Sequence, residues 1–77
     1  MVWNYRVVHI IDTNGKDWYA IHEVYYDDEY SAPKMVTTDS VSVGGEDLEE
    51  LAADMVHYFK ALSKPVLEYD EIGKKSF

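Results

Sequence analysis

Two β-rich runs separated by an Asn-Gly pair place the strongest constraint on the fold of this chain. Residues 3–11 and 18–26 consist mostly of β-branched and aromatic side chains, and Asn14-Gly15 lies between them. An Asn-Gly pair flanked by such runs is the strongest short-range signal for a β-hairpin, because both residues tolerate the backbone angles of a tight turn. Residues 35–43, rich in Val and Thr, then predict a third strand. The sequence therefore predicts an antiparallel three-stranded meander.

A capped amphipathic helix is predicted after the third strand. Asp47 is a favourable N-cap, and Glu50 is placed to bond back to the Asp47 amide in a capping box. Apolar residues then recur at three- and four-residue spacing, forming one stripe of Leu48, Leu51, Ala52, Met55, Phe59 and Leu62. Pro65 stops the helix, and residues 66–69 could add a short fourth strand. Residues 70–77 are predicted to form a flexible tail.

The predicted fold class is α+β, with one helix packed on one face of the meander and a possible short fourth strand. A chain of 77 residues without cysteine can build one small core and no disulfide framework. We therefore expect residues 1–77 to form a single domain, with an ordered core over about residues 2–69.

The register of the hairpin decides which side chains share a face. A loop of two or four residues sets Arg6 opposite Glu23. The face toward the helix then collects Trp3, Tyr5, Val7, His9, Ile11, Trp18, Ala20, His22, Val24 and Tyr26. The apolar residues of the other face would form an exposed patch suited to an interface, made of Val8, Ile10, Tyr19, Ile21 and Tyr25. A three-residue loop would invert the faces, so the exposure of Val8 and Ile21 tests this register.

The charge of the chain restricts its partners. Seven Lys and Arg against fifteen Asp and Glu give a formal net charge of −8. Such a field repels nucleic-acid phosphates and anionic lipid and attracts basic protein surfaces. We expect a basic protein partner, no direct nucleic-acid binding and no membrane binding, although the same charge also suits a surface that only keeps the domain soluble. Without a leader pattern or an apolar run of about 18 residues, a soluble cytoplasmic protein is predicted.

No group of residues predicts catalysis or metal binding. Under the predicted register His9 and His22 share a face, but that face is the expected core and His57 projects from the far side of the helix. Histidines satisfied by hydrogen bonds are therefore expected rather than a zinc pair. No serine lies in a nucleophile elbow, and the acidic residues 27–29 lack the spacing and glycine of a calcium loop. We expect neither an enzyme nor a cofactor.

The predicted partner-binding surface combines an acidic loop with the sheet face expected to be turned away from the helix. Its residues are Tyr19, Glu23, Tyr25, Asp27, Asp28, Glu29 and Tyr30. The carboxylates would attract a basic surface, and the tyrosines would supply large contact area with few rotatable bonds.

The residues around the helix carry a family resemblance. The helix start reads Gly45-Glu46-Asp47-Leu48-Glu49-Glu50-Leu51, and Lys64-Pro65-Val66 follows the helix. Over residues 44–66 this resembles the HicB-like antitoxin domain, in which a glycine-led Leu-Glu-Glu helix start precedes a proline-bearing short strand. The resemblance implies a partial RNase H-like fold with strand order 3-2-1-4 and a last strand parallel to the first. It also implies binding and masking of a small basic RNA-cleaving toxin.

Three functional hypotheses follow. The leading one is a non-enzymatic acidic binding module that docks a basic partner, most concretely by neutralising a toxin or nuclease-like protein. The second is a phage-type DNA mimic that inhibits a nucleic-acid-binding machine such as a CRISPR complex, with phosphate-like carboxylates at Glu46, Glu49, Glu50 and Asp54. The third is a small structural homodimer that pairs sheet faces or edges.

Overall fold

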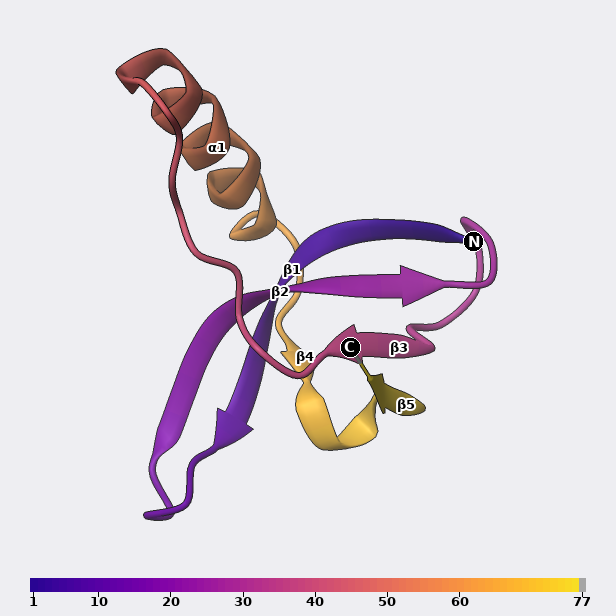
Figure 1. The fold of residues 1–77 in the computed structure, drawn as a ribbon. Coiled ribbons are helices and arrows are strands. Elements are labelled where there is room, and N and C mark those ends of the chain that lie inside the picture. The colour runs from indigo at the N-terminus through magenta and orange to yellow at the C-terminus, as the bar shows by residue number, and fades with distance from the viewer. Residues whose placement is uncertain (77) are drawn as a thin grey trace.

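A computed structural model describes residues 1–76 as a small α+β fold (Figure 1). The elements in chain order are β1 (Val2–Ile11), β2 (Asp17–Tyr26), β3 (Met35–Thr37), α1 (Leu48–Ala61), β4 (Leu67–Glu68), the 3₁₀ turn η1 (Tyr69–Glu71) and β5 (Lys74–Ser76). The strands form one mixed sheet in the order β4-β1-β2-β3-β5. The predicted antiparallel pairing of β1 with β2 and of β2 with β3 is present, while β4 runs parallel to β1 and β5 parallel to β3.

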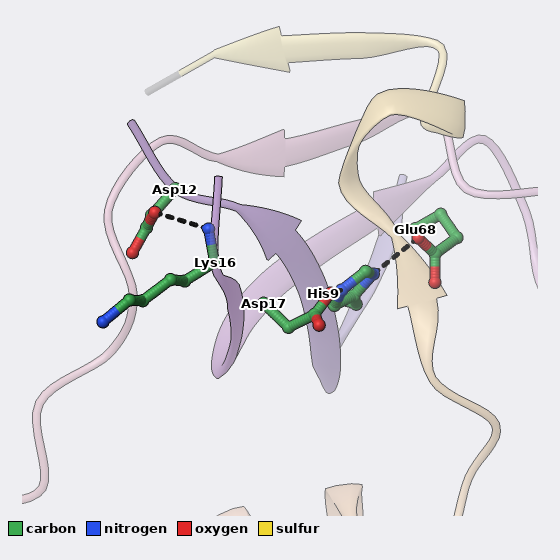
Figure 2. A network of polar contacts seen from close by, with 5 residues as sticks. All are labelled: His9, Asp12, Lys16, Asp17 and Glu68. Carbon is green, nitrogen blue, oxygen red and sulfur yellow. Dashed lines mark hydrogen bonds and ion pairs between the residues drawn. The ribbon is translucent and has the colours of Figure 1, made fainter. Parts of the chain in front are cut away.

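The hairpin turn has a different length from the predicted one. The amide of Asp12 donates to the carbonyl of Lys16 at 2.8 Å, which leaves residues 13–15 as the loop. Gly15 has a φ of 80°, a left-handed conformation that glycine adopts without steric cost. The Asp12 carboxylate accepts a hydrogen bond from the Asn14 amide at 2.8 Å. It also accepts one from the Lys16 amide at 2.9 Å, which Figure 2 shows. These contacts hold a three-residue loop with a bulged glycine.

The odd loop length shifts the register by one residue, so the predicted register is wrong. Arg6 faces His22, and Tyr5 faces Glu23. Val8 is fully buried and Ile21 is half-buried, so neither belongs to an exposed patch on a shared face. The β2 residues expected under the helix lie on the opposite face: Trp18, Ala20, His22, Val24 and Tyr26. We call the face bearing Val8 and Val24 the closed face, and the face bearing Tyr5 the open face.

The closed face holds the hydrophobic core. Val8, Val24 and Val36 are fully buried, and Ile72 packs with them. Tyr26, Leu67 and Tyr69 surround this cluster. The segment predicted to be a flexible tail therefore contributes a core residue, because the η1 turn carries Ile72 back onto the sheet; Phe77 lies outside the described residues.

The helix lies against the open face. Asp47 caps it as predicted, since its carboxylate accepts from the Glu50 amide at 2.8 Å. Tyr58 and Ala61 are its buried residues, and the Tyr58 ring meets the Tyr5 ring edge-on at 4.8 Å. The predicted apolar stripe does not face the sheet. Leu48, Met55, Phe59 and Leu62 are 82%, 55%, 72% and 62% exposed.

The segments that flank the helix are less regular than predicted. β3 ends at Thr37 instead of extending to residue 43, although the Val41 amide still donates to the Ile21 carbonyl at 2.8 Å. After the helix, the Arg6 guanidinium donates to the Pro65 carbonyl at 2.6 Å. This bond fixes the chain as it enters β4, which is the predicted short fourth strand.

Candidate partner-binding surface

The structure separates the predicted partner-binding residues into two groups. Tyr19 lies near the hairpin turn, where it is exposed and its ring packs 4.8 Å from the His9 ring. Glu23, Tyr25 and residues 27–30 lie toward the other end of β2. Because a strand rises by about 3.3 Å per residue, Tyr19 is roughly 20 Å from Tyr25. The second group therefore forms the candidate surface, without Tyr19.

Residues 27–30, which we call the acidic loop, are held in shape by hydrogen bonds. The Asp28 carboxylate accepts from the Tyr30 amide at 2.8 Å and from the Ser31 hydroxyl at 2.9 Å. The bond from the Tyr30 amide, followed by that from the Ser31 hydroxyl, lowers the pKa of Asp28. Asp27 pairs with Lys34 at 3.0 Å. The loop thus presents its charge on a defined backbone.

The outermost residue of the acidic loop is an aromatic one. Tyr30 is 93% exposed, and Glu29 beside it is exposed as well. The Lys34 amide donates to the Tyr25 carbonyl at 2.9 Å, which joins the end of the loop to β2. A large side chain held in water by a fixed loop is the kind of group that a protein partner buries.

An aromatic cluster adjoins the acidic loop on the open face. Trp3 of β1 faces Tyr25 of β2, with the ring centres 6.3 Å apart. Trp3 also meets Tyr5 edge-on at 5.2 Å, yet half of its surface remains exposed. The Tyr25 hydroxyl donates to the Glu23 carboxylate at 2.7 Å, and this bond raises the pKa of Tyr25. Trp3 was missed from the sequence because its face was expected to be covered by the helix, whereas the helix leaves half of the Trp3 surface exposed. The wrong register also placed Tyr25, its partner in the structure, on the opposite face.

Two of the three histidines, His9 and His22, make hydrogen bonds on opposite faces of the sheet. His9 lies between two carboxylates, with Glu68 Oε1 2.7 Å from Nδ1 and Asp17 Oδ1 2.7 Å from Nε2 (Figure 2). The bonds to Glu68 and then to Asp17 raise the pKa of His9. His22 is buried on the closed face and donates from Nδ1 to the Thr37 carbonyl at 2.9 Å. Across residues 1–76 no cluster of three or more His, Asp or Glu side chains is arranged to hold a metal ion.

Searches against known families, curated proteins and solved structures give no match to this chain. Within the described part of the chain, no helix has the length and hydrophobicity required to cross a bilayer. The function of this chain is therefore inferred from the geometry and charge of the surface itself.

Proposed function

We propose that this protein is a non-enzymatic binding module that docks a basic protein through the acidic loop and the Trp3–Tyr25 pair. The observation that carries this proposal is a half-exposed tryptophan stacked beside a tyrosine, next to a loop whose carboxylates are held by hydrogen bonds. Trp and Tyr dominate binding energy at protein interfaces, because they bury large area at low entropic cost. Carboxylates at the rim steer a basic partner into place.

In its most concrete form, the module neutralises a small basic toxin or nuclease-like protein. The net charge of −8 suits a partner with a basic, nucleic-acid-binding surface. β4 lies beside β1 and parallel to it, which is the strand order that the HicB-like resemblance implies, and this supports the same reading. Masking the basic surface of such a partner would exclude its RNA substrate.

The DNA-mimic hypothesis receives less support from the helix carboxylates. Asp54 is half-buried, and the Tyr58 hydroxyl lies 3.5 Å from its Oδ2. A phosphate-like row needs each carboxylate free to face the partner. Asp54 interrupts the row that Glu46, Glu49 and Glu50 would begin.

Binding measurements on a panel of purified basic RNA-cleaving toxins test the proposal. For a toxin that binds, Trp3→Ala and Glu29→Lys should each weaken the affinity about tenfold, because each removes a central contact or reverses a rim charge. Glu46→Lys makes the same charge change at the start of the helix and should alter the affinity less than about twofold. Equal losses from both Glu→Lys variants, or no toxin bound by the wild type, would overturn the proposal.

A further inference from the structure

The outward side of α1 is an apolar surface with no cover from the described chain. The four residues that we call the helix stripe are Leu48, Met55, Phe59 and Leu62, all more than half exposed. A groove of about 250 Å³ runs beside the stripe, lined by Ile21, Val43, Met55, Tyr58, Phe59 and Leu62. None of these lining side chains carries a charge. Contiguous apolar surface of this kind is rare on monomers and marks an interaction site.

The way α1 contacts the sheet explains why the stripe faces outward. Tyr58 and Ala61 are the helix residues that are buried. Phe59 follows Tyr58 and is turned by about 100° around the helix axis, so it points away from the sheet, while Tyr58 itself borders the stripe beside Met55 and Leu62. A 14-residue helix is marginal in water without tertiary packing. Two buried side chains provide little such packing, so burial of the stripe by another surface would stabilise α1.

The charges of α1 are segregated along its length. Glu49, Glu50 and Asp54 lie in its first half, and Lys60 lies in its last turn. Glu49 and Lys60 are eleven residues apart, which is close to three helical turns, so both lie on one line along the flank of the stripe. Among the ion pairs between the side chains described for residues 1–73, none involves Lys60 or Glu49. Glu49 at one end of this line and Lys60 at the other are therefore each available to pair with an opposite charge on a partner.

We propose that the helix stripe docks the helix stripe of a second copy of this chain, with the two α1 helices antiparallel about a two-fold axis near Met55. In that arrangement Glu49 of each copy lies next to Lys60 of the other. A two-fold interface requires a self-complementary surface, and a helix with an apolar centre and opposite charges at its two ends meets that requirement.

Charge also decides between a second copy and a basic partner as the occupant. A chain of net charge −8 repels itself over most of its surface. In an antiparallel pair of α1 helices, however, the acidic end of each helix lies beside the basic end of the other. A basic partner would gain nothing from a groove without carboxylates. The dimer leaves the acidic loop and Trp3 on other elements, so this inference goes beyond the proposed function and does not rest on it.

Light scattering after size exclusion tests the dimer at micromolar concentration and low salt. The wild type should elute with twice the 8.9 kDa chain mass, and Phe59→Asp should elute as a folded monomer by circular dichroism. Trp18→Asp places the same charge at an exposed aromatic position on the closed face of the sheet, so this variant should remain dimeric. A monomeric wild type, or a Phe59→Asp dimer, would overturn the proposal. Phe59→Asp should keep its toxin affinity, which separates failure of the dimer from failure of the proposed function.

A charge swap within the chain tests the antiparallel geometry. Glu49→Lys and Lys60→Glu should each raise the dimer dissociation constant about threefold at low salt, because each sets like charges together. The double variant restores opposite charges across the two-fold axis and keeps the wild-type net charge, so it should recover the wild-type constant. A double variant as weak as the sum of the single variants would exclude an antiparallel arrangement.

Discussion

The two faces of one β-hairpin differ sharply in how completely they are buried. On the closed face Val8, Val24 and Val36 have no exposed surface, whereas on the open face the covering helix leaves its stripe more than half exposed. Both faces are built from alternate residues of the same strands, so strand composition does not explain the contrast. The difference shows that this fold is stabilised mainly from one side and leaves the other side available for partners.

The contrast follows from how the covering segments are attached. The closed face is covered by η1 and Ile72, which follow β4 directly and are tied to the sheet by strand pairs on both sides. The open face is covered by α1, which Figure 1 shows extending beyond the sheet from a long connection after β3. Tyr58 anchors it, and burial raises the pKa of this tyrosine to about 12. One anchoring aromatic side chain fixes the position of a helix without burying its apolar stripe.

Removing one side chain from the closed face and one from the outward side of α1 should give the largest contrast. Val24→Ala deletes two fully buried methyl groups and leaves a cavity, so it should lower the free energy of unfolding by about 2–3 kcal/mol. Met55→Ala removes a side chain that is more than half exposed on the helix and should cost less than about 1 kcal/mol in a monomeric background such as Phe59→Asp. Urea denaturation at equal protein concentration measures both. Equal losses would show that the outward side of α1 contributes to stability as much as the closed face does.

The turn into α1 offers a second comparison, on the open side alone. A Cβ added to Gly45 would lie 2.6 Å from the Leu51 nitrogen and 2.7 Å from the Glu50 Cβ, too close for the first turn of the helix to remain in place. Gly45→Ala should therefore lower the free energy of unfolding by about 1–2 kcal/mol.

Gly44→Ala is the matched control, because a Cβ at Gly44 meets nothing within 4 Å. This variant should be neutral or slightly stabilising, by up to about 1 kcal/mol, since alanine restricts the unfolded chain. Thermal unfolding followed by circular dichroism compares the two variants. If both glycines tolerate alanine equally, the position of α1 does not depend on this turn.

The sequence predicted where the hairpin and the helix lie in the chain better than it predicted which side chains share a face of the sheet. Asn14-Gly15 located the hairpin and Asp47 located the helix start, because both signals are local. The register depended on the Asp12 side chain, which stabilises a three-residue loop that the same dipeptide does not specify. Val7 and Val8 are adjacent and both buried, so alternation along β1 gave no preference between the two registers.

The candidate surface was also predicted only in part, because only some of its residues are marked by local signals in the sequence. The acidic loop was found from composition alone, because charged residues between two strands lie at the surface. Tyr19 and Tyr25 were placed on the wrong face, and the pairing of Trp3 with Tyr25 was missed, because these positions depend on the register, which is a tertiary property. Ile72 was missed because a single apolar residue in a polar segment has no periodic pattern to mark it.

The smallest predicted effect concerns the polar contacts that hold the open face near the hairpin turn. His9 lies on that face, and its bonds to Glu68 and Asp17 raise its pKa above the ordinary 6.5. A raised folded-state pKa means that the folded protein binds the proton more tightly than the unfolded chain does. The resulting stability is fully present below the unfolded pKa and is lost as pH rises through the raised pKa.

His9→Gln removes this titration while keeping a polar side chain at the position. The wild type should unfold at a higher urea concentration than His9→Gln, and this difference in midpoint should be larger at about pH 6 than at about pH 8. The rest of the chain is identical in the two proteins, so its contribution cancels in the difference. If this difference in midpoint were constant or grew toward pH 8, neutral His9 would stabilise the folded protein at least as much as charged His9 does. The open face would then owe its stability near the turn to hydrogen bonding alone, with no contribution from the charge of His9.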